Sequence, residues 1–238
     1  MSVFVVCPAF NEEHSVGRVV NEIRSSVPDA QVLVVDDGSH DATGSVARRA
    51  GARVLTLPFN VGVGGALRVG LLLAAREGAS AVVQCDSDGQ HPAKSIGSLV
   101  AALSHSDIVI GSRFAGDRDY QMVGPRRWAS KLLGWAMSRV HNSELDDVTS
   151  GFRAFGPNAI RVLSVELPPE YLADTIDALV IAKSHGLIVS QLAVEMSPRL
   201  AGVPSHGPLK SGVYLGRSVL VLVLSLAQLV GQRIWRSS

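Results

Sequence analysis

Runs of apolar residues alternate with amphipathic stretches along the first half of the chain. Five short apolar runs are predicted to be strands, at residues 3–7, 31–35, 53–57, 81–85 and 107–110. The stretches between them carry apolar positions at helical spacing and are predicted to be helices, at residues 12–25, 42–50, 64–77 and 95–103. The strand runs are continuously apolar, which is typical of parallel strands covered on both faces. The pattern therefore predicts an α/β fold with a mostly parallel, doubly wound sheet.

The alternation of strands and helices weakens after Gly111. Residues 112–127 are polar and contain glycine, so we expect a loop there. Beyond this loop the pattern predicts helices at 128–140 and 171–185, a short strand at 151–155 and a last strand at 187–194. Residues 201–212 hold three glycines, two prolines and two serines, and this composition predicts a hinge or linker.

Composition and charge narrow the function classes. The 238 residues are 47% hydrophobic, enough for a sizeable core. The chain has 22 lysine and arginine residues and 21 acidic residues, and this balance argues against a domain that binds duplex nucleic acid. Two cysteines, Cys7 and Cys85, end apolar runs and are expected to be buried thiols. The N-terminus lacks the basic region of a secretory signal, so we expect an intracellular protein.

Acidic residues follow three of the predicted strands at the points where the strands end. The strands lead into Phe10-Asn11-Glu12-Glu13, Asp36-Asp37-Gly38-Ser39 and Asp86-Ser87-Asp88-Gly89. Ligands of open α/β sheets bind at the carboxyl ends of strands, and clustered carboxylates repel unless a cation joins them. The pair after the fourth strand suits Mg²⁺ or Mn²⁺. An alternative for the carboxylates after the second strand, including Asp41, is that they cap the next helix.

Several segments, taken in chain order, resemble the family 2 glycosyltransferases. They are residues 5–13, residues 35–43, Asp86-Ser87-Asp88 with Gln90-His91-Pro92, Gly111-Ser112-Arg113-Phe114, and residues 147–153. The group they resemble most is the dolichyl- and polyprenyl-phosphate mannose and glucose synthases. The resemblance runs from about residue 3 to residue 205. It implies the GT-A nucleotide-sugar-binding fold and transfer of a hexose from GDP-mannose or UDP-glucose to a polyprenyl or dolichyl phosphate, with inversion.

The same resemblance implies roles for individual residues. The nucleoside pocket would be lined by Pro8, Phe10, Glu12, Val35 and Asp37. The metal and diphosphate site would consist of Asp86, Asp88 and Gln90, with Mg²⁺ or Mn²⁺ as the cofactor. Phosphate groups of the substrates would be bound by Arg113, Arg126 and Arg199, because a guanidinium matches phosphate geometry.

Two positions depart from the family pattern. The family usually has tyrosine where Phe10 stands, so one hydroxyl contact is missing and base selectivity changes. In the closing segment His206 stands where a lysine is expected, which would make phosphate binding pH dependent near the histidine pKa of about 6.5. Lys210 is a possible substitute for that lysine.

The acceptor decides whether a general base is needed. A lipid monophosphate, with a second pKa of about 6, is already largely dianionic and needs cations to position it. The segment 112–131 is rich in arginine and lysine, including Arg118 and Lys131, which suits such an acceptor. A hydroxyl acceptor would need a carboxylate base, and Asp147, Asp174 and Asp177 are the candidates.

The C-terminal part is expected to be an appendage of the catalytic domain. We assign residues 1–205 to the catalytic domain and residues 206–238 to a linker and a helix. Residues 213–235 have a wide apolar face, a narrower polar face and flanking arginines. The apolar core of this helix is about 18 Å long, short of the ~30 Å of a bilayer. We expect an interfacial helix at the inner face of the cytoplasmic membrane; packing on a homo-oligomer partner and an assisted membrane span are the alternatives.

Three other function classes compete with this interpretation. Asp86-Ser87-Asp88-Gly89 imitates the nucleophile motif of haloacid dehalogenase-type phosphatases, although Gln90 and its late position do not fit. Gly62-Val63-Gly64-Gly65 suggests a dinucleotide-binding dehydrogenase, but the glycine spacing is wrong. A non-catalytic nucleotide- or lipid-binding module would keep the pocket and show no turnover.

Overall fold

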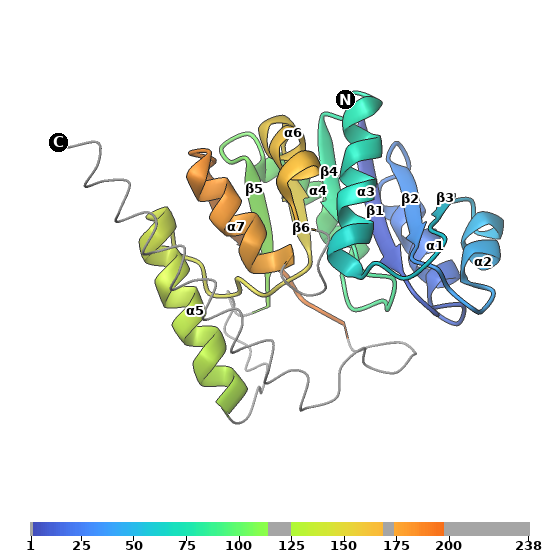
Figure 1. The fold of residues 1–238 in the computed structure, drawn as a ribbon, viewed down its shortest axis with the longest axis horizontal. Helices are drawn as coiled ribbons and strands as arrows, with labels where there is room; N and C mark the ends of the chain where they lie inside the picture. The colour runs from blue at the N-terminus through green and yellow to red at the C-terminus, as the bar shows by residue number, and fades with distance from the viewer. Residues whose placement is uncertain (1, 114–124, 169–173, 198–238) are drawn as a thin grey trace.

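A computed structural model describes residues 2–113, 125–168 and 174–197. For residues 125–132 and residue 174 it describes the backbone only. Within these ranges seven strands form one sheet in the order β3-β2-β1-β4-β6-β5-β7. The strands are β1 (Val3–Ala9), β2 (Gln31–Asp36), β3 (Arg53–Thr56), β4 (Ala81–Gln84), β5 (Ile108–Ser112), β6 (Arg153–Phe155) and β7 (Val189–Ala193). Only β6 runs antiparallel to its two neighbours, β4 and β5. The predicted mostly parallel α/β sheet is confirmed (Figure 1).

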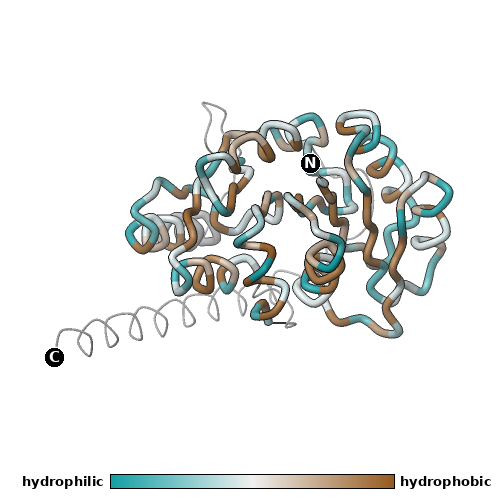
Figure 2. The backbone as a smooth tube through the Cα atoms, turned by 90° about the horizontal axis from the view of Figure 1, so that it is seen from above, coloured by the Kyte–Doolittle hydropathy of each residue, from teal (hydrophilic) through white to brown (hydrophobic). Residues whose placement is uncertain are grey.

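Helices cover both faces of the sheet. They are α1 (Val16–Ser26), α2 (Thr43–Arg49), α3 (Val63–Arg76), the 3₁₀ turn η1 (Ala93–Ser95), α4 (Ile96–Ala102), α5 (Pro125–His141), α6 (Pro157–Glu166) and α7 (Asp174–Ser184). Successive strand side chains point to opposite faces and enter two separate cores. Phe4 and Val6 of β1 pack with α3, α6 and α7, whereas Val5 and Cys7 pack with α1 and α4. Figure 2 shows hydrophobic residues along the strands and hydrophilic ones in many of the surrounding turns.

Three features differ from the sequence prediction. The first helix begins at Val16 instead of residue 12, because Asn11 adopts a left-handed φ of 55° and the Ser15 hydroxyl bonds Glu12. No helix was predicted over α6, although Pro157 at its first turn is a helix-start signal. The antiparallel direction of β6 was also not predicted, since three residues carry too little pattern to show direction. The expected buried thiols, Cys7 and Cys85, are confirmed.

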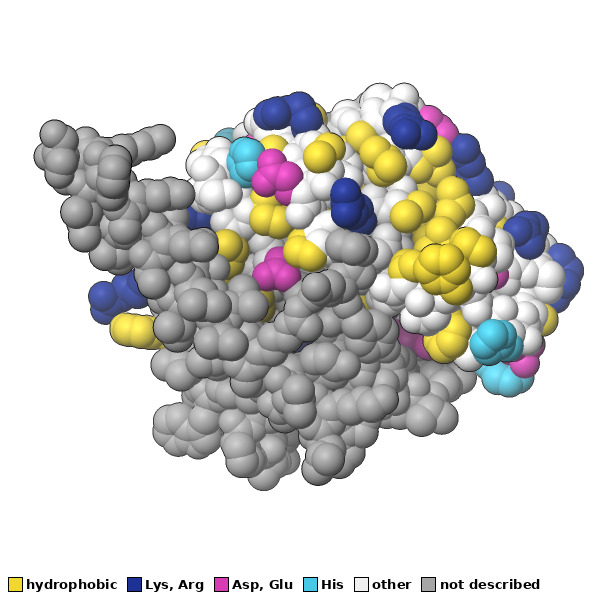
Figure 3. Space-filling view, viewed as in Figure 1, with side chains coloured by type: hydrophobic (Ala, Val, Ile, Leu, Met, Phe, Trp, Pro, Cys, Tyr) yellow, Lys and Arg dark blue, Asp and Glu magenta, His cyan; other side chains and the backbone are white. Residues whose placement is uncertain are grey.

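The part of the chain that the structure describes holds no helix long and apolar enough to cross a bilayer. The predicted C-terminal helix and the domain boundary at residue 205 lie outside the described residues. On the face drawn in Figure 3, hydrophobic side chains gather in a patch on the right-hand part, and Lys and Arg side chains lie scattered around it.

Gly70 marks a close contact between α3 and the sheet. A side-chain carbon at this buried position would clash with the methyl groups of Val6 in β1. We expect Gly70→Ala to lower the free energy of unfolding by about 1–3 kcal/mol, the usual cost of overpacking a core. Urea denaturation measures this change. The matched control is Gly97→Ala in α4, where the added carbon meets open space and stability should rise by about 0.4–1 kcal/mol. Equal effects of the two substitutions would contradict the close packing of α3 on β1.

Candidate functional site

The polar residues singled out in the sequence meet at one edge of the sheet. The carboxyl ends of the parallel strands β1, β2, β4 and β5 lie there, and so does the start of β6, because β6 runs in the opposite direction. Strands β2, β1 and β4 are neighbours, so the three predicted acidic loops do come from adjacent strands. This confirms that they share one edge of the sheet.

The loops after β1 and β2 are joined to each other by hydrogen bonds. The backbone N–H of Asn11 donates to the Ser39 hydroxyl (3.0 Å), and the N–H of His40 donates to the Asn11 side chain (2.9 Å). Phe10 is partly exposed, and its ring meets that of His40 edge to face at 6.2 Å. The two loops therefore form one wall that presents Phe10 at its surface.

Asp41 and Asp37 both bind backbone N–H groups, but in different places. Asp41 accepts from the N–H of Thr43 at the start of α2 (2.9 Å) and from the N–H of Glu13 (3.1 Å), so the predicted capping role fits it. Asp37 is buried, and its two oxygens accept from the N–H groups of Val61 and Gly62 at 2.8 Å each. Burial raises the pKa of Asp37, against the lowering effect of these two bonds. Asp37 thus fixes the turn before α3 at the edge of the predicted nucleoside pocket.

The Asp86-Ser87-Asp88 turn after β4 is anchored to its surroundings. The buried Ser87 hydroxyl donates to the carbonyl of Pro8 (2.9 Å), so the turn is tied to the end of β1. Oδ1 of Asp88 accepts from the N–H of Gln90 at 3.0 Å. The carbonyl of Gln90 in turn accepts from the N–H of Ser197 at 2.9 Å. The turn is thereby linked both to the predicted nucleoside pocket and to the backbone that leads toward Arg199.

His91 stabilises the same turn through contacts with Asp86 and Phe152. Its Nδ1 accepts from the N–H of Asp86 (2.9 Å), its Nε2 lies 3.6 Å from Oδ2 of Asp86, and its ring stacks on Phe152 at 4.9 Å. Burial lowers the pKa of His91, but the charge of Asp86, followed by the Cys85 thiol and by Asp88, raises it to about 9. The hydrogen bond from the Asp86 N–H requires that Nδ1 of His91 carries no proton. A cation bound to the carboxylates would also oppose their raising effect on the His91 pKa. Neutral His91, with Nε2–H toward Asp86, therefore fits this geometry.

The donor set of this turn fits a hard divalent ion. The described residues hold no group of three or more His, Cys, Asp and Glu side chains that could enclose a metal. Mg²⁺ and Mn²⁺ in phosphate sites need no such cage, since one or two carboxylates with water and phosphate oxygens suffice. The Asp86 side chain is 38% exposed at the sheet edge, so a cation can reach it from solvent. Asp86 is therefore accessible to such an ion together with a diphosphate, and the buried Asp88 lies two residues further along the same turn.

The segment before β6 reaches both the Asp86 turn and the end of β5. At Gly151 an added side-chain carbon would lie 3.4 Å from Oδ2 of Asp86, so the backbone passes directly beside that carboxylate. At Asp147 the same segment binds Arg113, which follows β5. Nε and Nη2 of Arg113 donate to the two carboxylate oxygens at 2.6 and 2.7 Å. Residues 147–151 thus connect the candidate metal turn with the candidate phosphate-binding arginine.

Arg153 holds this segment in place from inside the protein. The side chain is buried and donates to the carbonyls of Ser150 (2.8 Å), Val148 (2.6 Å) and Thr175 (2.7 Å). It therefore closes the loop before β6 and links it to the start of α7. No role was predicted for Arg153. A charged residue within an apolar run is the signal that could have pointed to a buried structural arginine.

The predicted site residues fall into three groups. Those brought to the common edge are Pro8, Phe10, Glu12, Val35, Asp37, Asp86, Asp88, Gln90 and Arg113. The side chains of Arg126, Lys131 and Asp174 are not described, and Arg118, Arg199, His206 and Lys210 lie outside the described residues. Sequence reasoning missed His91, Ser87 and Gly151 as supports of the turn, because their contacts depend on the fold.

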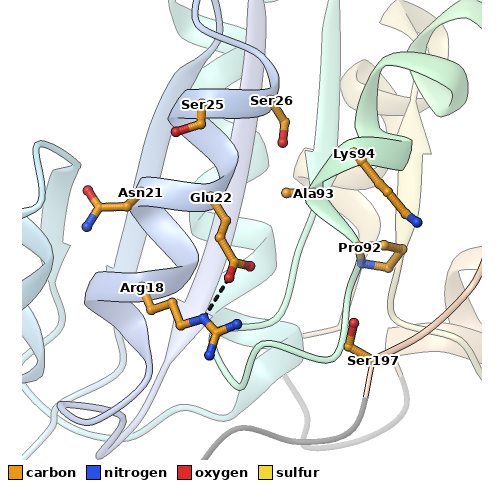
Figure 4. Close-up of a pocket in the computed structure, with 9 residues that line it drawn as sticks. All are labelled: Arg18, Asn21, Glu22, Ser25, Ser26, Pro92, Ala93, Lys94 and Ser197. Atoms are coloured by element: carbon orange, nitrogen blue, oxygen red, sulfur yellow. Dashed lines mark hydrogen bonds and ion pairs between the residues drawn. The ribbon is translucent and has the colours of Figure 1, made fainter.

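A separate groove of about 650 Å³ lies on the α1 side of the molecule (Figure 4). Among the residues that the structure describes, none of the predicted site residues lines it. Arg18 in this groove is paired with Glu22 at 2.7 Å, and Lys94 lies 3.7 Å from Glu195. Because these basic groups are already paired with carboxylates, the groove has no charge pattern that selects an ion.

Comparison with known proteins identifies the family of the chain. The family model for "Glycosyl transferase family 2" matches residues 4–164. Undecaprenyl-phosphate mannosyltransferase of Micrococcus luteus is 31% identical over 70% of this chain and 71% of its own length. Polyprenol monophosphomannose synthase of Mycolicibacterium smegmatis is 26% identical over 84% of this chain and 78% of its own.

A solved structure supports the fold. Glucosyl-3-phosphoglycerate synthase of Mycobacterium tuberculosis, crystallised with Mn²⁺, UDP and glucosyl-3-phosphoglycerate, superimposes with a TM-score of 0.67. It is 25% identical and covers 94% of this chain and 79% of its own. The similarity confirms the predicted GT-A fold, and the bound ion is consistent with divalent metal use in such sites.

Proposed function

We propose, from the premise that the chain belongs to the family 2 glycosyltransferases, that it moves a hexose from a nucleotide diphosphate sugar to a polyprenyl phosphate with inversion. One observation carries the proposal: Asp86 and Arg113, at the ends of β4 and β5, are joined across one sheet edge by residues 147–151. A donor site with carboxylates and an acceptor site with a guanidinium are thereby held together. Undecaprenyl-phosphate mannosyltransferase and polyprenol monophosphomannose synthase among the relatives favour this acceptor class.

On the donor side, the residues around the Asp86 turn bind the nucleotide sugar. The partly exposed Phe10 contacts the base, and the Asp37 region lines the nucleoside pocket. Asp86 and Asp88, with Gln90, hold a divalent ion and the diphosphate. When bound, that ion supplies neutralisation of the charge that develops on the leaving diphosphate. Ser87 and His91 keep the turn in place through their bonds to Pro8 and to the Asp86 backbone.

On the acceptor side, Arg113 binds and orients a phosphate dianion. Such a nucleophile is already deprotonated near neutral pH, so the site needs no general base. Asp147 was the candidate base nearest to Arg113, but it is fully buried and both its oxygens accept bonds from that arginine. The arrangement therefore favours a phosphate over a hydroxyl. Arg126 and Arg199 are proposed to complete the phosphate site.

A second candidate acceptor is a hydroxyl group of a small molecule. The M. tuberculosis structure that carries glucosyl-3-phosphoglycerate favours this alternative. Asp177 in α7, or Asp174, would then be the base. Asp174→Asn and Asp177→Asn together separate the two cases: both should leave transfer to a lipid phosphate largely intact, and for a hydroxyl acceptor one of them should abolish transfer.

The proposed donor can be tested by ligand-linked thermal stabilisation. We expect GDP-mannose or UDP-glucose to raise the melting temperature more in Mn²⁺ than in EDTA, because binding to the folded state stabilises it. The sugar nucleotide that stabilises most is then offered with a short-chain polyprenyl phosphate, and the glycosylated lipid is measured. Stabilisation by no nucleotide sugar, or transfer only to hydroxyl acceptors, would contradict the proposal.

Membrane association is proposed to involve α5 as well as the C-terminal segment. Trp135 is 59% exposed on α5, and the Arg139 guanidinium lies 5.2 Å from the centroid of its ring. Exposed tryptophan and arginine side by side suit the interface of an anionic membrane, where aromatic rings sit at the headgroups and each basic residue adds about 1 kcal/mol. The catalytic edge would then face the inner surface of the cytoplasmic membrane.

Substituting Trp135 tests this orientation. We expect Trp135→Ala to weaken binding to phosphatidylglycerol vesicles about tenfold, which corresponds to ~1.4 kcal/mol of lost apolar burial. Vesicle co-sedimentation measures the change. Ile188→Ala is the control, since Ile188 is similarly exposed but precedes β7, at the opposite sheet edge. Equal loss in both variants, or loss in neither, would contradict a membrane-facing α5.

A further inference from the structure

The ion pair between Arg113 and Asp147 is buried on one side and accessible on the other. The Asp147 side chain is 0% exposed and that of Arg113 is 25% exposed. Asp147 accepts three bonds from the same residue: from Nε (2.6 Å), from Nη2 (2.7 Å) and from the backbone N–H of Arg113 (3.1 Å). A bidentate pair of this kind fixes the plane of a guanidinium as well as its distance.

The carboxylate itself is held rigidly by its neighbours. The Thr149 hydroxyl lies 3.3 Å from both Oδ1 of Asp147 and Nη2 of Arg113, so it bridges the pair. Ser150, three residues after Asp147, donates its hydroxyl to the carbonyl of Gly111 at 2.7 Å. The N–H of Gly111 donates to the carbonyl of Phe152 at 2.7 Å. The loop that carries Asp147 is therefore fixed to β5, the strand that carries Arg113.

A buried carboxylate costs stability unless it is paired, and a hydrophobic pair of the same size would often serve the fold equally well. The pair here has a feature that a purely structural contact does not need. Asp147 takes the Nε–Nη2 edge of the guanidinium, and the Arg113 side chain as a whole keeps 25% of its surface exposed. A guanidinium held in this way can meet a phosphate in one orientation.

We propose that Asp147 is a positioning residue, which fixes the guanidinium of Arg113 in the orientation that receives the phosphate of the acceptor. This inference rests on the proposed function, because it takes the acceptor to be a phosphate. It assigns Asp147 a role other than that of a base: its oxygens are occupied by Arg113 and Thr149, and its side chain has no exposed surface.

Steady-state kinetics of Asp147→Asn test the role. The amide keeps the size of the side chain but loses the charge and one of the two acceptor atoms. We expect the KM for a short-chain polyprenyl phosphate to rise at least tenfold while the KM for the sugar nucleotide changes less than threefold. Asp146→Asn is the matched control, because Asp146 is the exposed neighbour, bonded to Gln191, and should leave both KM values unchanged. An unchanged acceptor KM in Asp147→Asn would overturn the proposal.

A double variant shows whether Asp147 acts through Arg113. If it does, Arg113→Ala/Asp147→Asn has the same acceptor KM as Arg113→Ala alone. A further increase in the double variant would overturn the proposal, since Asp147 would then act independently. A large loss of kcat in Asp147→Asn at unchanged acceptor KM, with loss of the acidic limb of the pH–rate profile, would instead identify a base.

Chemical modification separates this inference from the proposed function. Phenylglyoxal labelling of residue 113, followed by mass spectrometry, reports how firmly the guanidinium is held and needs no substrate. We expect the labelling rate to rise at least fivefold in Asp147→Asn and to stay unchanged in Asp146→Asn. Equal rates in Asp147→Asn and the parent would overturn the proposal even if transfer to lipid phosphate is observed. If the parent transfers sugar to no lipid phosphate, the proposed function fails, and with it the acceptor part of the inference, whatever the labelling shows.

Discussion

Asp88→Asn is expected to lower the rate of sugar transfer by at least about 100-fold, because even residues that only support metal ligands contribute about 10–100-fold. Asp88 lies in the turn after β4 and organises it through the bond from the Gln90 N–H. The substitution removes the charge that holds a divalent ion while keeping the size of the side chain. The loss should therefore fall on chemistry and diphosphate binding, and the free energy of unfolding should change little.

Calorimetric binding of the nucleoside diphosphate distinguishes a metal site from a general loss of fold. We expect Asp88→Asn to bind the diphosphate much more weakly than the parent in Mn²⁺ and about equally in EDTA. Asp29→Asn, a change of the same kind at an exposed carboxylate between α1 and β2, should match the parent in both conditions. Equal activity of Asp88→Asn and the parent would remove Asp88 from the site.

The common sheet edge of the three acidic loops could be predicted because it follows from local pattern. Strand β1 ends just before Phe10, β2 ends at Asp36 and β4 ends two residues before Asp86. All three are mostly apolar, and parallel strands deliver their ends to one edge. The register of β1 against β4, with Val6 opposite Gln84, then brings Ser87 to the Pro8 carbonyl. No pattern in the sequence predicts that bond, since it depends on how two strands far apart in the chain are aligned.

The acceptor side was harder to predict for the same physical reason. Arg113 was identified by resemblance. Its partner Asp147 is 34 positions away and was considered as part of the family motif at residues 147–153 and as a base, but not as a partner of Arg113. The two meet because β6 inserts antiparallel between β4 and β5 and so brings the preceding loop to the active edge. The three residues of β6 do not reveal that direction. The same insertion sets Gly151 beside Asp86, a contact that the glycine alone does not indicate.

Arg113→Ala is expected to reduce stability as well as activity. It leaves the fully buried Asp147 without its cation, and breaking a buried ion pair in this way typically costs about 3–5 kcal/mol. We expect the lower end, about 3 kcal/mol, because Arg113 is 25% exposed and solvent can enter the vacated space. Guanidinium chloride denaturation of the variant measures the loss.

The double variant Arg113→Ala/Asp147→Asn should recover most of that stability, since it removes the uncompensated charge together with its partner. The activity of the double variant therefore reports the loss of the arginine separately from a loss of folding stability. Arg53→Ala breaks the exposed pair with Glu77 and should cost less than about 1 kcal/mol, as surface pairs do. If Arg113→Ala lowers the free energy of unfolding no more than Arg53→Ala does, the buried charge of Asp147 does not need Arg113 to compensate it. If instead the double variant is stable and still transfers no sugar to a lipid phosphate, the loss of transfer is caused by the missing guanidinium. An uncompensated buried carboxylate cannot explain it, because the double variant has none.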